Sequence, residues 1–124
     1  MASSTHYRWA DMKPEQMNPH TTRQYITGAN TTVARVGLKK DAVVAEHHHF
    51  HEQISYILEG SIKFLIDGKE VIVKAGEVLC IPPHLPHGVV SLEDSMVLDI
   101  FNPTRQDWID GDDAYLRVGA PAKS

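Results

Sequence analysis

Short apolar segments recur along the chain from Thr31 onward and are separated by turn residues. In segment 61–66, Ile62, Phe64 and Ile66 fall at every second position, the period of a strand with one buried face. Asp67-Gly68 then separates this segment from the apolar run 71–73, a pattern typical of a β-hairpin. Segments of this kind predict strands over 32–38, 54–58, 61–66, 71–73, 78–81, 88–91 and 95–101. Strands at this spacing, with no convincing helical period, favour an all-β sandwich or barrel.

The two ends of the chain have a different character from its middle. Residues 1–30 are polar and interrupted by prolines, so we expect an N-terminal arm or edge strands there. Residues 31–101 form the predicted barrel core, and 102–124 form an acidic tail. Trp108 and Tyr115 of this tail are expected to cover the barrel exterior or a dimer partner. A length of 124 residues predicts a single domain, 1–124.

The composition narrows the classes of partner and compartment. Hydrophobic residues make up 42% of the chain and charged residues 23%, the balance of a soluble globular protein. A net charge of −4 argues against a nucleic-acid or anionic-membrane partner, because both select basic surfaces. The start of the chain lacks the apolar core of a signal peptide, which predicts a cytoplasmic protein. The single cysteine, Cys80, excludes an internal disulfide, and we expect it to be a buried, inert thiol.

Histidines are the conspicuous feature: the chain has eight, and four of them lie within residues 47–51. In an extended strand, His47, His49 and His51 point to one face, Gln53 continues that face, and His48 faces away. Two imidazoles at alternate positions on the inner face of a barrel can chelate one metal ion. A lone histidine is more often a partly exposed polar residue, but clustered ligand-type residues on a β scaffold indicate a metal site.

A further ligand must come from elsewhere in the sequence. His84 and His87 lie in a loop whose conformational freedom is reduced by Pro82, Pro83 and Pro86. This loop leads into the next predicted strand and therefore offers a ligand from a second element.

These residues carry a family resemblance. The runs His47-x-His49-x3-Gln53-x6-Gly60 and Gly76-x5-Pro82-x-His84-x2-His87 resemble the paired motifs of the cupin family, HxHx3–4Ex6G and Gx5PxGx2H. The resemblance spans about Thr31 to Phe101. It implies a double-stranded β-helix (jelly-roll) barrel with one metal ion held by His47, His49, Gln53 and His87. The sequence departs from the motifs where Gln53 replaces glutamate and where His84 and Asp41 replace glycines.

The glutamine changes the expected charge of the site. Three imidazoles and an amide bring no anionic ligand, so a divalent ion keeps its full charge and attracts a carboxylate or enediolate. Glu52 is adjacent on the opposite face of an ideal strand and would replace Gln53 only through a local bulge. Such a donor set accepts Ni, Zn, Fe, Co, Mn or Cu, so the residues do not select one metal.

A narrower resemblance concerns the KdgF-type cupins, the pectin-degradation branch of the family. It rests on the run 51–56, the Pro-Pro-His-x-Pro-His-Gly-Val-Val segment and the run Leu98-Asp99-Ile100-Phe101-Asn102-Pro103-x-Arg105-x-Asp107. The resemblance implies ring opening of the 4,5-unsaturated uronates that lyases release from pectin or alginate. The product would be a linear 4-deoxy-5-keto-uronate.

Four residues suit that chemistry, and each has a simpler interpretation. Asp99 would be the general acid/base, or else a strand-edge residue paired with Arg105. Arg105 would hold the substrate carboxylate through a bidentate pair. Phe101 would pack against the sugar ring or belong to the core, and Tyr56 would donate to the substrate or pack.

Other functions and roles stay open at this point. One alternative is an iron-dependent dioxygenase or polyketide-cyclase-like cupin, and another is a non-enzymatic small-molecule-sensing module. A barrel edge strand favours a homodimer. His51 and His84 are candidates for the pocket mouth or for support of the ligands, and we expect no chemistry from His48, His6 or His20.

Overall fold

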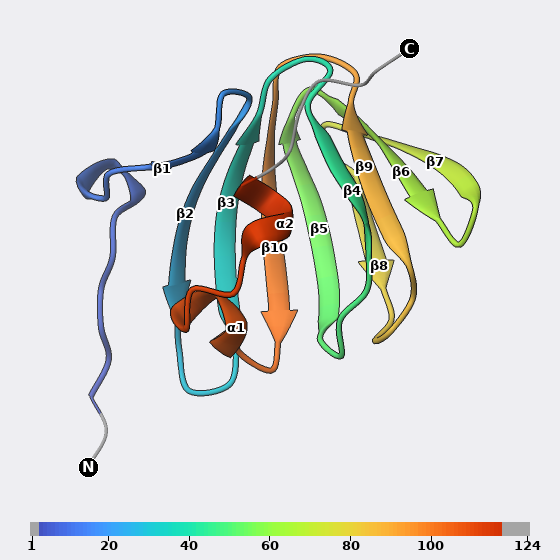
Figure 1. Ribbon diagram of the computed structural model, residues 1–124. Helices are drawn as coiled ribbons and strands as arrows, with labels where there is room; N and C mark the ends of the chain where they lie inside the picture. Colours follow the sequence, from blue (N-terminus) through green and yellow to red (C-terminus); the bar gives the residue numbers. More distant parts are fainter. Residues whose placement is uncertain (1–2, 118–124) are drawn as a thin grey trace.

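The computed structural model describes residues 3–117 and consists of two antiparallel sheets packed face to face as a jelly roll (Figure 1). The six-stranded sheet has the order β1 (Glu15–Asn18), β2 (Thr21–Thr27), β3 (Thr32–Leu38), β10 (Ser95–Asn102), β5 (Glu52–Glu59) and β8 (Val78–Ile81). The four-stranded sheet has the order β4 (Val43–His47), β9 (His87–Ser91), β6 (Ser61–Ile66) and β7 (Lys69–Lys74). The helices are η1 (Trp9–Asp11), α1 (Gln106–Ile109) and α2 (Ala114–Arg117). The predicted all-β jelly-roll class is confirmed.

Alternation along each strand explains why these residues form this sandwich. Buried and partly exposed positions alternate strictly along β3, and the inward positions of β5 are Gln53, Ser55 and Ile57. The inward apolar side chains meet between the sheets, where Ile57 and Ile62 are fully buried. Burial of one such side chain contributes roughly 1.5–3 kcal/mol, so the core defines which face of each strand points inward.

The prediction of a continuous strand through the histidine run is wrong. β4 ends at His47, residues 48–51 form a loop, and β5 begins at Glu52. The loop is held by a hydrogen bond from the His84 backbone N–H to the His49 carbonyl oxygen at 2.7 Å. His49 is therefore placed by contact with the 82–86 loop and not by strand alternation.

The C-terminal segment closes one open side of the sandwich. Helix α2 contacts both β1 and β4, the strands at one end of each sheet (Figure 1). Two contacts hold it: the Asn18 side chain donates to the Leu116 carbonyl at 2.6 Å, and Arg23 pairs with Asp113 at 2.9 Å. Both members of this ion pair are buried, so a buried contact joins the N-terminal hairpin to the C-terminal segment.

Cys80 does not occupy the buried position expected from its apolar strand. It is exposed on β8, an edge strand, because it shares the outward face with Val78. No helix within residues 3–117 is long and apolar enough to cross a membrane.

At the two positions where the cupin motifs have glycine and this chain has another residue, the backbone keeps the left-handed conformation. Asp41 has φ 70° and His84 has φ 67°, close to the φ 85° of Gly60 and 87° of Gly76. The departures from the motifs therefore change the side chain and preserve the turn.

We expect Asp41→Gly to stabilise the fold by about 0.5–1 kcal/mol. Left-handed backbone costs an L-residue about 1–2 kcal/mol, and the larger unfolded-state entropy of glycine offsets part of the gain. Lys40→Gly, at the preceding exposed position, lacks this strain and should destabilise. Urea unfolding midpoints of the two variants measure the difference, and equal shifts would contradict the explanation.

Candidate metal and substrate site

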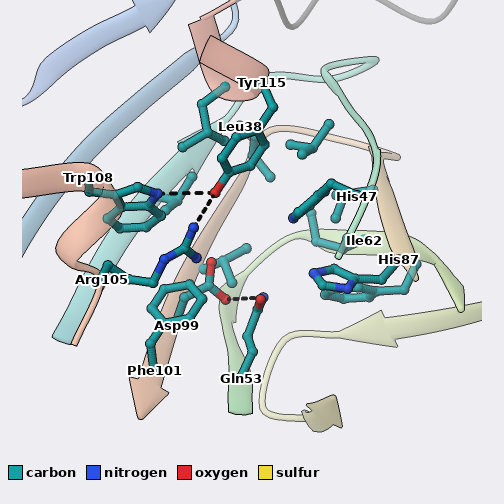
Figure 2. A pocket seen from close by; sticks show the side chains of 16 residues that line it. Leu38, His47, Gln53, Ile62, His87, Asp99, Phe101, Arg105, Trp108 and Tyr115 are labelled. Atoms are coloured by element: carbon teal, nitrogen blue, oxygen red, sulfur yellow. Dashed lines mark hydrogen bonds between the residues drawn. The ribbon is translucent and has the colours of Figure 1, made fainter. Parts of the chain in front are cut away.

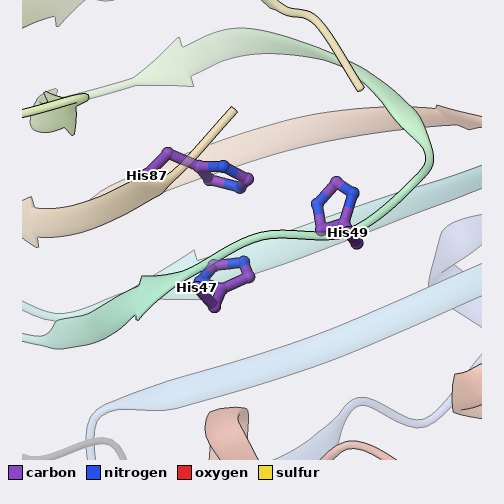
Figure 3. A group of neighbouring side chains, drawn as sticks. All are labelled: His47, His49 and His87. Carbon is purple, nitrogen blue, oxygen red and sulfur yellow. The ribbon is translucent and has the colours of Figure 1, made fainter. Parts of the chain in front are cut away.

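Three histidines converge at one end of the sandwich (Figure 3). His47 ends β4, His87 begins β9 directly opposite it in the sheet, and His49 lies in the loop after β4. One ring nitrogen of each lies within 4.8 Å of the other two. This separation allows the three nitrogens to share one metal ion.

Hydrogen bonds orient the three rings as ligands. Each ring places Nδ1 against a backbone carbonyl two residues away: Ala45 for His47 (2.9 Å), His51 for His49 (3.1 Å) and Leu85 for His87 (2.8 Å). A carbonyl oxygen only accepts, so Nδ1 carries the proton and Nε2 keeps its lone pair. A donated Nδ1–H of this kind is the usual support for a metal-ligating imidazole.

The fourth predicted ligand, Gln53, presents its side-chain oxygen to this cluster. The Oε1 of Gln53 lies 3.1 Å from Nε2 of His49. Hydrogen bonds on the other side of the amide fix the orientation of Gln53, because its Nε2 donates to Ser55 Oγ at 3.0 Å and to Asp99 Oδ1 at 3.4 Å. Two lone-pair atoms therefore face each other, an arrangement that a shared cation would stabilise.

The protonation of the rings is consistent with metal binding. Burial lowers the pKa of His47 from 6.5 to about 4 and that of His49 to about 3. Burial also lowers the pKa of His87, whose Nε2 is buried without a hydrogen-bond partner among residues 3–117. Neutral imidazoles at pH 7 offer lone pairs without competition from protons. The donor set therefore fits a divalent transition metal.

Two histidines of the cluster, His47 and His87, line a pocket between the two sheets (Figure 2). His47, Gln53 and His87 form one wall, Asp99 and Phe101 of β10 form another, and side chains of the C-terminal segment complete it. Within these walls the space open to water-sized molecules is about 50 Å³.

Asp99 brings a carboxylate to the candidate ligands. Its Oδ1 accepts a hydrogen bond from Ser55 Oγ at 2.6 Å and from Gln53 Nε2 at 3.4 Å. Burial raises the pKa of Asp99 to about 6, although these two hydrogen bonds act in the opposite direction. Ser55 was not singled out from the sequence; its signal is a small polar side chain two positions after Gln53 on the inner face of β5.

Comparison with known proteins identifies the family. Residues 34–101 match the family model described as Cupin domain. The chain belongs to the cupin family. It is 34% identical over 98 residues to "Pectin degradation protein KdgF" of Dickeya dadantii (strain 3937), covering 77% of this chain and 89% of that protein. The structure of KdgF from Halomonas sp. superposes with a TM-score of 0.81 at 27% identity, covering 86% of this chain and 99% of that one. The KdgF-type resemblance seen in the sequence is therefore confirmed.

A more distant relative belongs to another enzyme class. Acireductone dioxygenase of Bacillus pumilus (strain SAFR-032) is 30% identical over 70 residues, covering 52% of this chain and 40% of that protein. Known relatives of this cupin thus include more than one kind of enzyme.

Arg105 is differently placed from the expected clamp. Its Nε and Nη2 donate to the two carboxylate oxygens of Asp107 at 3.0 and 2.8 Å, and Nη2 also donates to Tyr115 Oη at 2.9 Å. The bidentate edge of the guanidinium is occupied by Asp107, so a bidentate clamp on a substrate carboxylate is not available in this conformation. Nη1 has no hydrogen bond to any residue of 3–117 and is the group left for a ligand.

Aromatic side chains form the rest of this cupin's pocket. Phe101 is buried and lines the pocket, so it belongs to the core and to the cavity wall at once. Trp108 and Tyr115 also line the pocket, which corrects the expectation that they cover the exterior or a dimer partner (Figure 2). Trp108 Nε1 donates a hydrogen bond to Tyr115 Oη at 3.1 Å. The centroid of the Tyr115 ring lies 4.5 Å from that of the His47 ring.

The remaining predicted residues lie outside the cluster. Tyr56 alternates with the inward residues of β5, so it faces outward with 39% exposure and cannot donate into the pocket. Glu52 is exposed, which leaves Gln53 as the inward oxygen donor. His51 is buried beside the cluster with Nε2 toward the Thr104 carbonyl at 3.2 Å, and the His84 side chain is exposed.

Proposed function

We propose that this cupin opens the ring of 4,5-unsaturated uronates derived from pectin or alginate and yields the linear 4-deoxy-5-keto-uronate. The supporting observation is that His47, His87 and Gln53 of the candidate donor set line the same pocket as the carboxylate of Asp99, to which Gln53 donates a hydrogen bond. Similarity to a pectin degradation protein over most of both chains supports the same substrate class.

Arg105 and Phe101 are suited to hold the substrate. The unpaired Nη1 of Arg105 supplies one hydrogen bond to the uronate carboxylate, and Phe101 offers an apolar wall to the sugar ring. His47, His49, Gln53 and His87 would hold a divalent ion, which supplies Lewis-acid stabilisation of negative charge developing on substrate oxygen.

The reaction is an isomerisation that needs one proton to move. The anomeric hydroxyl loses its proton as the bond between C1 and the ring oxygen breaks, giving an aldehyde at C1 and an enolate whose oxygen is on C5. Carbon C4 then gains a proton and the enolate becomes a ketone at C5. Asp99 accepts the first proton and donates the second, so atoms and electrons balance without an oxidant.

Substrate binding requires the pocket to widen. Pockets for small ligands commonly measure about 300–1,000 Å³, whereas the present space for water-sized molecules is about 50 Å³. Tyr115 and Leu116 on α2 line this cavity, so displacement of α2 would enlarge it and would require the contacts of this segment with Asn18 and Arg23 to loosen.

The test follows the ultraviolet absorbance of a 4,5-unsaturated uronate. Protein stripped with chelator and reloaded separately with Ni, Zn, Fe, Co, Mn or Cu should accelerate loss of this absorbance over the spontaneous rate with at least one metal. The stripped protein should return to the spontaneous rate. If no loaded form accelerates the loss, ring opening is not the activity of this protein.

The second candidate function is that of an iron-dependent dioxygenase, which the similarity to acireductone dioxygenase favours. Oxygen uptake distinguishes it, because ring opening consumes no oxygen. A sensing module is distinguished by ligand binding without turnover.

A further inference from the structure

The hydroxyl of Tyr115 is held at the pocket by two groups that can only donate hydrogen bonds. Arg105 Nη2 lies 2.9 Å from Tyr115 Oη, and Trp108 Nε1 lies 3.1 Å from it (Figure 2). A guanidinium and an indole N–H contain no acceptor atom, so both bonds use lone pairs of the phenol oxygen. The O–H of Tyr115 must therefore donate to some other group.

No residue within 3–117 accepts this proton. In that range Tyr115 Oη forms hydrogen bonds with Arg105 and Trp108 only. Burial raises the pKa of Tyr115, although Arg105 acts in the opposite direction, so the hydroxyl keeps its proton at neutral pH. Hydroxyls in such surroundings normally have an acceptor, and Tyr115 lines the pocket. The acceptor must therefore come from a molecule in the pocket.

Arg105 places a second donor next to this hydroxyl. Its Nη1 has no hydrogen bond within residues 3–117, whereas Nε and Nη2 are occupied by Asp107 and Tyr115. The guanidinium carbon lies 4.6 Å from the centre of the Phe101 ring and 4.3 Å from that of the Trp108 ring, so two aromatic side chains fix its position. Nη1 and Nη2 share this carbon, so Nη1 and the Tyr115 hydroxyl are neighbouring donors on the pocket wall.

Two neighbouring donors, one of them cationic, suit a ligand group with two acceptor oxygens. A carboxylate is such a group, and hydrogen bonds to an ionised acceptor are roughly twice as strong as neutral ones. Asp107 occupies the bidentate edge of Arg105, so Arg105 is left to bind one oxygen of a carboxylate. The second oxygen then needs a donor from another residue, and the Tyr115 hydroxyl is placed to supply it.

We propose that Tyr115 is a substrate-binding residue whose hydroxyl donates to one oxygen of the uronate carboxylate while Arg105 Nη1 donates to the other. The choice of a uronate as the ligand rests on the proposed function. Tyr115 lies on α2, whereas Arg105 directly precedes α1, so the two donors meet only when α2 is seated against the pocket. Binding of the carboxylate therefore favours the closed position of the segment that must move for substrate entry.

Isothermal titration with D-galacturonate tests the contact without turnover, because this uronate has no 4,5 double bond. In the zinc-loaded full chain, Tyr115→Phe should raise the dissociation constant about 10–100-fold, since a hydrogen bond to a charged group is lost. Tyr25→Phe is the matched control: Tyr25 also packs against Trp108, with ring centroids 5.5 Å apart, but does not line the pocket. This variant should bind D-galacturonate as the wild type does, and thermal unfolding checks that both variants are folded.

A crystal structure of the D-galacturonate complex separates direct contact from support of Arg105. Tyr115 Oη and Arg105 Nη1 should each lie within hydrogen-bond distance of a different carboxylate oxygen. A carboxylate bound elsewhere, no binding by the wild type, or unchanged affinity of Tyr115→Phe overturns the proposal.

Kinetics with the 4,5-unsaturated uronate distinguish this proposal from the proposed function. Tyr115→Phe should raise KM about tenfold and change kcat less than about threefold, because the carboxylate is held alike in the ground and transition states. A fall in kcat at unchanged KM contradicts a binding role. If the wild type opens no ring but its affinity for D-galacturonate depends on Tyr115, the proposed function fails and the carboxylate site stands.

Discussion

His49→Ala is expected to abolish stable metal binding and, with it, the proposed activity. The ring contributes one of three nitrogens within 4.8 Å, and its Nε2 faces the Gln53 oxygen at 3.1 Å. Loss of a supporting residue alone typically lowers metal affinity 10–100-fold, so loss of a ligand should lower it by at least about 100-fold. Isothermal titration with Ni²⁺ or Zn²⁺ into chelator-treated protein measures the change.

His48→Ala provides the matched control. His48 is the immediate neighbour, but its side chain is exposed and is not one of the three clustered histidines. We expect wild-type metal content and activity for this variant. Equal metal affinity of His49→Ala and the wild type would show that the ion, if bound, is held elsewhere.

The structure gives a physical reason for the neutral ligand. The amide of Gln53 presents oxygen to the histidines and uses its Nε2 to donate to the Asp99 carboxylate at 3.4 Å. A glutamate at this position would place a second anion beside Asp99 and remove that donor. The departure from the family motif and the nearby acidic side chain are therefore two parts of one arrangement.

The strands and the metal cluster were predictable because both depend on local spacing. Segments 32–38, 61–66 and 78–81 coincide with β3, β6 and β8, since a period of two is imposed by burial of one face. His47 and His87 meet because β4 and β9 pair, as the paired motifs imply. The loop at 48–51 was missed because its conformation depends on a hydrogen bond to the distant 82–86 loop.

The part of the pocket wall that residues 106–117 form was not predictable from the local sequence pattern. Segment 106–117 has no periodic apolar positions, and its place depends on contacts with Asn18 and Arg23, about ninety residues away along the chain. The pairing of Arg105 with Asp107 likewise decides which guanidinium edge is free, and sequence spacing alone gives no sign of it. Strand alternation did carry the information that Tyr56 faces outward, opposite to Gln53.

Asp99→Asn should lower the rate of ring opening by about 10²–10⁴-fold while leaving metal binding unchanged. The amide keeps the size of the side chain and an oxygen that accepts the hydrogen bond from Ser55 Oγ, which spans 2.6 Å in the wild type. It cannot accept a proton from the anomeric hydroxyl or return one to C4. The loss should therefore appear in kcat more than in KM, as measured by the absorbance assay with metal content determined in parallel.

Two further variants separate proton transfer from positioning. Asp94→Asn changes an exposed carboxylate that accepts from the Lys40 N–H at 2.9 Å, far from the pocket, and should retain full activity. Ser55→Ala removes the hydroxyl that orients Asp99 and should cause a smaller loss than Asp99→Asn. In D₂O, the wild type should place deuterium on one face of C4, because Asp99 delivers it from one side, whereas Asp99→Asn should give the mixture of the spontaneous reaction. An Asp99→Asn protein that retains the wild-type rate and stereochemistry would remove Asp99 from the mechanism and leave proton transfer to another group of the pocket.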